Sequence, residues 1–94
     1  MIRVAFCDDD AGVLEEMRVF LDRYRAERGR EIGGWAFRSS VELLAEMEQG
    51  ARFDVLVLDI LMPGQNGIEA AEEIRSYDGN VKIVFLTSSA EFAV

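Results

Sequence analysis

The sequence predicts a single α/β domain in which helices cover both faces of a parallel sheet. Short apolar runs typical of buried strands alternate with segments whose apolar residues recur at helical spacing, in the order βαβαβαβ. The strand-like runs are almost entirely apolar, as expected for parallel strands buried on both faces. The chain has 94 residues, of which 50% are hydrophobic, enough for one small domain with its own core.

The first third of the chain predicts a strand, a helix and a second strand. Ile2–Cys7 is short, almost wholly apolar and followed by polar residues, which indicates a buried strand. A helix follows, ending near Gly29, because apolar residues recur at helical spacing. These residues are Val13, Leu14, Met17, Phe20, Leu21 and Tyr24. Glu31–Phe37 is a weaker strand that contains two glycines, and we expect it at an edge of the sheet.

The middle of the chain predicts a short helix and a second buried strand. Ser39 and Glu42 have the spacing of a capping box, so a helix should begin there and continue through Gln49, with Gly50 ending it. Phe53–Leu58 is again nearly all apolar and should be a buried strand that delivers Asp59 to the following turn.

The last third predicts a loop at Pro63–Gly67, a helix and a third buried strand at Val81–Leu86. One apolar helix face is expected from Ile68, Ala71, Ile74 and Tyr77. Ser88 and Glu91 have the spacing of a second capping box, so another helix should begin there. Only a few residues follow, which is too short for a stable helix, and we expect the chain to be a truncated piece.

Charge and cysteine content exclude several functions. The formal net charge is −8, so the chain should bind neither nucleic acid nor an anionic membrane through its own surface. Its single cysteine, Cys7, lies in an apolar run and should be a core residue, which fits a reducing cytoplasm. There is no signal-peptide pattern at the start and no apolar run of the roughly 20 residues that span a bilayer.

Acidic residues follow two of the predicted buried strands. Asp8, Asp9 and Asp10 come after the first strand, and Asp59 ends the next one that is buried. The carboxyl ends of parallel strands meet at one edge of the sheet, where ligands bind in such folds. Carboxylates gathered there repel one another unless a cation neutralises them. A site made of oxygen ligands favours a hard ion, Mg²⁺ before Mn²⁺ or Ca²⁺.

Asp59 is the better candidate for a nucleophile, because it stands alone at its strand end and carboxylates form acyl phosphates. Thr87 follows the last strand. If Asp59 received a phosphoryl group, the Thr87 hydroxyl would lie beside the phosphoryl oxygens. Asp10 is better interpreted as the N-cap of the helix that follows. Each acidic residue taken singly is more often structural, and their grouping at the ends of the strands favours a functional site.

These motifs resemble the receiver domain of bacterial two-component response regulators. The matching segments are VAFCDDD, VLVLDILMPGQNG and VFLTS, and the most specific is D-x-x-M-P-G-x-x-G at Asp59–Gly67. The resemblance runs from Met1 to Val94 and implies a CheY-like, flavodoxin-like doubly wound sheet. The implied strand order is 2-1-3-4, and residues 1–94 would be one receiver domain that lacks the fifth strand and last helices.

The resemblance implies a role for each matching residue. Asp59 would be the phosphoacceptor and also a metal ligand, beside Asp8 and Asp9, the acidic pair that holds Mg²⁺. The backbone carbonyl of Leu61 would be a further metal ligand, and Thr87 the switch hydroxyl. A sensor histidine kinase would donate the phosphoryl group, with at most self-phosphorylation from small donors and autodephosphorylation as activities of the domain itself.

The start of this sequence and its last segment, LTSSAEFAV, most resemble receivers that are joined to LytTR-type DNA-binding output domains. This resemblance implies that the output is transcription. The family also implies a fifth strand that ends in a lysine, and this sequence contains neither that strand nor that lysine. Lys82 is the only lysine in the chain and lies about 16 Å from the site along its strand. The incomplete sheet would expose the strand Val81–Leu86 and favour a homodimer or higher oligomer.

Two other interpretations remain open from the residues alone. A haloacid-dehalogenase-like phosphatase would use Asp8 and Asp10 as nucleophile and acid, but this leaves the segment after Asp59 unexplained. The second interpretation is an interaction module that has the same fold but carries out no chemistry. The grouped acidic residues argue against this interpretation.

Overall fold

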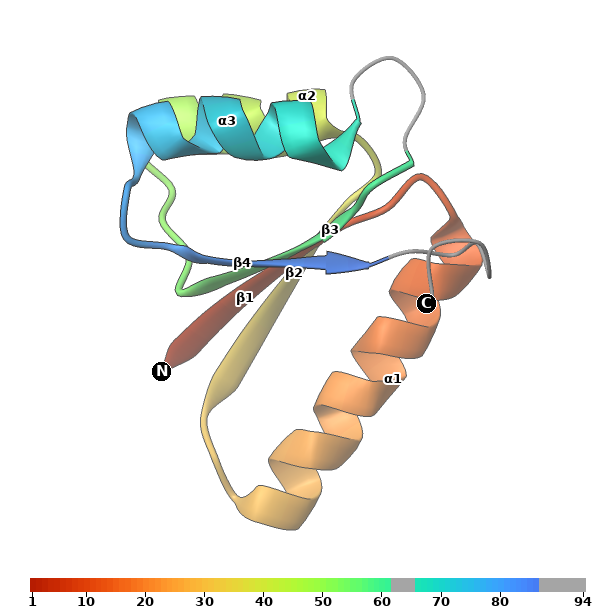
Figure 1. Ribbon diagram of the computed structural model, residues 1–94. Helices are drawn as coiled ribbons and strands as arrows, with labels where there is room; N and C mark the ends of the chain where they lie inside the picture. Colours follow the sequence, from red (N-terminus) through yellow and green to blue (C-terminus); the bar gives the residue numbers. More distant parts are fainter. Residues whose placement is uncertain (62–65, 87–94) are drawn as a thin grey trace.

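The computed structural model describes residues 1–61 and 66–86, in which strands and helices alternate (Figure 1). The first half holds the strand β1, the helix α1, the strand β2 and the helix α2. The second half holds β3, α3 and β4. Their bounds are β1 Ile2–Cys7, α1 Ala11–Arg28, β2 Ile32–Phe37, α2 Ser40–Glu48, β3 Val55–Asp59, α3 Gly67–Tyr77 and β4 Lys82–Leu86.

The four described strands form one parallel sheet in the order β2-β1-β3-β4, which confirms the predicted order 2-1-3-4. β1 and β3 lie side by side in the centre, with Cys7 opposite Leu58. β2 is at one end of the sheet, so the prediction of an edge strand is correct. Lys82 begins β4 opposite Val55, at the other end of the strand from the acidic residues.

Helices cover both faces of the sheet (Figure 1). α1 lies on one face, and α2 and α3 lie together on the other. The main core fills the space between the sheet and the α2–α3 pair. Its buried members are Ala5, Cys7, Leu43, Met47, Phe53, Leu56, Leu58, Ile74 and Val81. Burial of Cys7 confirms its predicted core position.

The predicted ends of the helices agree with their capping contacts. Asp10 is the N-cap of α1, and its side chain accepts from the N–H groups of Gly12 and Val13. Gly29 ends α1 with φ 64°, a left-handed conformation that glycine adopts without strain. Ser39 caps α2 by accepting from the N–H of Glu42, as the capping-box spacing predicts.

Three details of the predicted elements are wrong. Gly67 was placed in a loop, but Asn66 is the N-cap of α3 and Gly67 is its first residue. Ile68 and Phe20 were placed on buried helix faces, yet their exposed fractions are 51% and 69%. Ala70 and Ile74, four residues apart on one face of the helix, are the apolar side chains that α3 buries.

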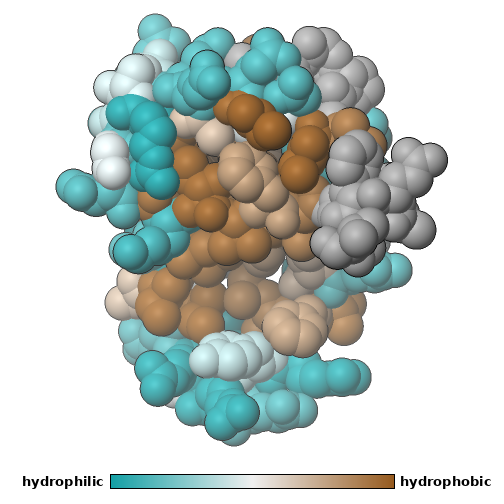
Figure 2. All heavy atoms as spheres, viewed as in Figure 1, coloured by the Kyte–Doolittle hydropathy of each residue, from teal (hydrophilic) through white to brown (hydrophobic). Residues whose placement is uncertain are grey.

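A broad apolar surface crosses the middle of the molecule, between the sheet and α1 (Figure 2). A hollow in this region is lined by Phe6, Val13, Glu16, Met17, Phe20 and Leu86. β4 contributes exposed apolar side chains as well, including Val84 and Phe85. In the part of the chain that the structure describes, no helix has the length and apolar character required to cross a membrane.

Candidate functional site

β1 and β3 bring three carboxylates together at the carboxyl edge of the sheet. Asp59 is the last residue of β3, and Asp8 and Asp9 directly follow β1, its neighbour in the sheet. One carboxylate oxygen from each of these three residues lies within 4.8 Å of the others. We call Asp8, Asp9 and Asp59 the acidic trio. The structure thus brings together the three side chains that the sequence predicts as metal ligands.

The trio has two buried members and one exposed member. Asp8 and Asp59 are each 3% exposed, whereas Asp9 is exposed at the surface. Each buried carboxylate accepts a hydrogen bond from the backbone two residues later. Asp10 N–H donates to Asp8 Oδ1 at 2.9 Å, and Leu61 N–H donates to Asp59 Oδ1 at 3.1 Å. These turns hold the two carboxylates in place through one oxygen each.

The electrostatic cost of this arrangement is visible at Asp8. Burial raises the pKa of its carboxyl above the usual value, and the negative charges of Asp59 and Asp9 raise it further. The hydrogen bond from the Asp10 N–H acts in the opposite direction. The charged form of Asp8 is therefore less favourable here than in a free aspartate, and a positive group near the trio would offset this cost.

Cys7 is not a second reactive group beside the trio. Burial raises the pKa of its thiol to about 12, and Asp8 is the largest of the negative charges that add to this effect. A thiol with such a pKa is protonated at neutral pH and is a poor nucleophile. The structure therefore supports its interpretation as a core residue.

Asp10 is close in sequence but has a different task. Its Oδ1 accepts from Gly12 N–H at 2.8 Å and from Val13 N–H at 3.4 Å, so its carboxylate caps α1. Asp10 does not belong to the trio. This confirms the N-cap interpretation and gives Asp10 a structural role, which argues against the phosphatase alternative that uses Asp10 as an acid.

The two remaining predicted site residues have different outcomes. Leu61 is among the described residues: its backbone N–H donates a hydrogen bond to the Asp59 carboxylate, and its side chain is 48% exposed. Thr87 lies outside the described residues, as do Met62–Gln65 and the predicted capping box at Ser88 and Glu91.

Two residues beside the trio were missed by the sequence analysis. A Cβ atom added at Gly67 would clash with the backbone oxygen of Asp59, so the start of α3 packs directly against the end of β3. Arg38 Nη2 donates to the backbone oxygen of Asp9 at 3.3 Å. Gly67 could have been found from its place in the motif, whereas the Arg38 contact joins residues 29 apart and depends on the fold.

The trio fits a hard divalent cation. Its donors are carboxylate oxygens, which Mg²⁺ prefers. One oxygen on each buried carboxylate is used by the backbone, which leaves its second oxygen as the candidate ligand. A cation there would also remove the repulsion that raises the pKa of Asp8.

Comparison with known families agrees with this geometry. Residues 4–94 match the family described as response regulator receiver domain. The chain belongs to the response regulator receiver domain family. It is thus a receiver domain of two-component response regulators, a signalling domain rather than an ordinary enzyme, and family members generally bind Mg²⁺ at acidic residues.

Two curated relatives illustrate the range of proteins that contain this receiver domain. The chemotaxis protein CheY of Thermotoga maritima is 34% identical over 94 residues, covering 98% of this chain and 72% of CheY. The transcriptional regulatory protein MalR of Bacillus subtilis (strain 168) is 30% identical over 94 residues, covering 100% of this chain. This chain spans only 38% of MalR, so most of that relative lies outside the match.

Solved structures include receiver domains with the same fold. In the crystal structure of the histidine kinase ThkA in complex with the response regulator protein TrrA, one chain is 31% identical to this receiver domain. The match has a TM-score of 0.74 and covers 100% of this chain and 75% of the other. The flavodoxin-like fold and the relation to response regulators are therefore supported independently of the motifs.

Proposed function

We propose that this receiver domain accepts a phosphoryl group on Asp59 with Mg²⁺ held by Asp8, Asp9 and Asp59. The carrying observation is the meeting of these three carboxylates within 4.8 Å at the end of the two central strands. The backbone carbonyl of Leu61, the residue whose N–H is bonded to Asp59, would be a further ligand. Bound Mg²⁺ would offset negative charge on the trio and on the incoming phosphoryl oxygens.

Asp59 is suited to the transfer because its carboxylate is buried but held at the edge of the sheet. The Leu61 N–H occupies Oδ1, and we assign the attack on phosphorus to Oδ2. The new O–P bond forms as the P–N bond of a phosphohistidine breaks, and the imidazole leaves with the electron pair and takes up a proton. Thr87, which follows β4, is the proposed switch hydroxyl that binds the phosphoryl oxygens.

The proposed donor is a sensor histidine kinase. Support comes from the ThkA–TrrA complex, in which the chain similar to this one occurs together with a histidine kinase. Small phosphodonors could replace the kinase, and slow hydrolysis of the acyl phosphate would return Asp59 to its free state. Both reactions use the carboxylate of Asp59.

The proposed output is transcription through a DNA-binding domain in the parent protein. MalR, a transcriptional regulatory protein, extends well beyond the matched region, which supports this proposal. The receiver itself, with its charge of −8, is not proposed to bind DNA or membranes. A LytTR-type output domain and a cytoplasmic location stay predictions from the sequence.

A mass measurement tests the phosphoacceptor function. The chain is incubated with Mg²⁺ and acetyl phosphate and its intact mass is compared with that of the untreated chain. We expect a gain of one phosphoryl group that Asp59→Asn abolishes and Asp10→Asn retains. The reverse pattern would favour the phosphatase interpretation, and no adduct on the unaltered chain would contradict phosphoacceptance by this chain.

A further inference from the structure

Asp9 differs from the other two members of the trio in how it is held. Asp8 and Asp59 are buried and their carboxylates accept backbone N–H groups, whereas Asp9 is exposed. The position of an exposed ligand depends on the backbone that carries it. Whatever holds the backbone of Asp9 therefore helps to determine whether its carboxylate reaches the cation site.

Arg38, at the end of the neighbouring strand β2, holds the backbone of Asp9. It directly follows β2, and its guanidinium Nη2 donates to the backbone oxygen of Asp9 at 3.3 Å. A second bond joins the same two loops, because Asp8 N–H donates to the backbone oxygen of Phe37 at 3.1 Å. The loop after β1 is thus tied to the end of β2 on both sides of the Asp8–Asp9 peptide bond.

Arg38 is itself anchored by the cap of α2. Its backbone N–H donates to Glu42 Oε2 at 3.2 Å, and the Glu42 backbone N–H in turn donates the capping bond to Ser39 Oγ. The guanidinium therefore extends from a backbone position that a helix cap holds. Such second-layer contacts commonly orient the residues that bind a metal.

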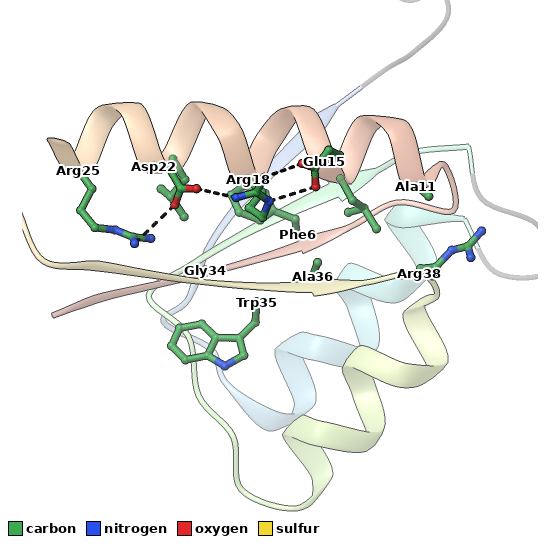
Figure 3. Close-up of a pocket in the computed structure, with 12 residues that line it drawn as sticks. Phe6, Ala11, Glu15, Arg18, Asp22, Arg25, Gly34, Trp35, Ala36 and Arg38 are labelled. Atoms are coloured by element: carbon green, nitrogen blue, oxygen red, sulfur yellow. Dashed lines mark hydrogen bonds and ion pairs between the residues drawn. The ribbon is translucent and has the colours of Figure 1, made fainter. Parts of the chain in front are cut away.

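Figure 3 shows how Arg38 differs from the other arginines in its surroundings. Arg18 and Arg25 lie along α1 and pair with acidic side chains of the same helix. A pocket lies between α1 and the sheet, and Arg38 lies at one end of it, near Ala11, the first residue of α1. The Arg38 side chain donates to a backbone oxygen, which suits a role in holding a loop.

We propose that Arg38 is a positioning residue that holds the Asp9 loop in the geometry needed to bind Mg²⁺. The proposal rests on the proposed function, because Asp9 is a ligand only if the trio binds the cation. Arg38 does not touch the metal or the phosphoryl group in this role. It acts through the Asp9 backbone.

Positioning and simple charge effects have opposite signs here, which makes the proposal testable. A positive guanidinium near a cation site repels Mg²⁺, so removing it would strengthen binding if only charge mattered. Removing a hydrogen bond that orders a ligand weakens binding instead. For Arg38→Gln we expect Mg²⁺ affinity to fall about fivefold, the scale of one net hydrogen bond.

The experiment is a calorimetric titration of the full chain with Mg²⁺ alone. Arg38→Gln should bind about fivefold more weakly, and Arg38→Lys, which keeps the charge and an N–H donor, should lie between it and the unaltered chain. Arg28→Gln is the matched control, because it removes the same charge at the far end of α1, about 26 Å from Ala11. Circular dichroism confirms that each variant is folded.

The outcomes separate the two proposals. Unchanged or tighter Mg²⁺ binding by Arg38→Gln would overturn the positioning role and leave the proposed function intact. An equal loss in Arg28→Gln would also overturn it, since the effect would then not depend on the contact between Arg38 and Asp9. If the unaltered chain did not bind Mg²⁺, the proposed function and the role of Arg38 would both fail.

Discussion

At the scale of single residues, the site contains two buried carboxylates whose cost of burial is reduced by hydrogen bonds from the backbone. Asp8 and Asp59 are almost fully buried, which is costly for charged groups. Backbone N–H groups from Asp10 and Leu61 reduce this cost at one oxygen of each. The remaining repulsion raises the pKa of Asp8 and favours a bound cation.

The stability of the metal-free domain should therefore change with pH through Asp8. Its folded-state pKa lies above the ordinary 3.8, so its contribution favours folding fully below that pH and is lost as pH rises through the raised value. At neutral pH without divalent ions, Asp8→Asn should stabilise the domain by on the order of 1 kcal/mol. Urea unfolding in the presence of a chelator measures this difference.

Magnesium should reverse that ranking. Saturating Mg²⁺ is expected to stabilise the unaltered domain, since a ligand that binds only the folded state adds to its stability. Asp8→Asn should gain much less. If Asp8→Asn were destabilising without metal and gained as much from Mg²⁺ as the unaltered domain, the account of the trio would be wrong.

Cys7 offers a separate test of burial at the end of β1. Because its thiol has a pKa of about 12 and is 1% exposed, we expect iodoacetamide to modify it very slowly in the folded domain. In urea the same thiol should react at the rate of an ordinary free cysteine. Rapid modification of the folded domain would contradict the described packing beside Asp8.

At the scale of elements, the start of α3 supports the end of β3. Gly67 N–H donates to the backbone oxygen of Ile60 at 3.0 Å, and the absence of a side chain lets α3 approach the backbone of Asp59. The acceptor residue thus has its neighbouring backbone packed against a helix. A side chain at Gly67 should therefore displace the backbone of Asp59.

Gly67→Ala should destabilise the domain by about 1–3 kcal/mol, because the new methyl group would meet backbone atoms that cannot rotate away. It should also lower the rate at which acetyl phosphate modifies Asp59. Gly79→Ala is the control, since an added Cβ there has nothing within 4 Å. Thermal unfolding and intact mass measure the two effects, and equal behaviour of both variants would refute the close contact.

The elements also show what sequence patterns can predict. Caps are local, so Asp10, Ser39 and Gly29 were assigned correctly from their neighbours. Ile68 and Phe20 were placed in the core because periodicity identifies an apolar face but not what covers it. In the site, strand ends identified the trio, whereas the contact between Arg38 and Asp9 depends on how two loops meet in space.

At the scale of the whole molecule, a strongly acidic domain carries an apolar surface along β4 and α1 (Figure 2). β4 pairs with β3 on one side and is the last described strand on the other. Its Val84 and Phe85 are 48% and 42% exposed. Exposed apolar residues on a terminal strand favour pairing with another chain, although the charge of −8 opposes it.

We therefore predict that this chain self-associates at tens of micromolar concentration, as a homodimer or larger assembly. Val84→Lys should weaken association about tenfold by placing a charge in the apolar surface. Val41→Lys adds the same charge on α2, at a valine that is 71% exposed, and should have little effect. Light scattering across a dilution series measures both, and a monomer at all concentrations would rule out the prediction.

The most direct test of the central claim is to locate the phosphoryl group within the chain. After reaction with acetyl phosphate and Mg²⁺, the acyl phosphate is reduced with borohydride and the peptides are sequenced by mass spectrometry. The account predicts a single reduced residue, Asp59, whose modification requires Mg²⁺ and is strongly reduced in Asp8→Asn. Modification at Asp8 or Asp10 instead, or modification of Asp59 that is indifferent to Mg²⁺, would contradict it.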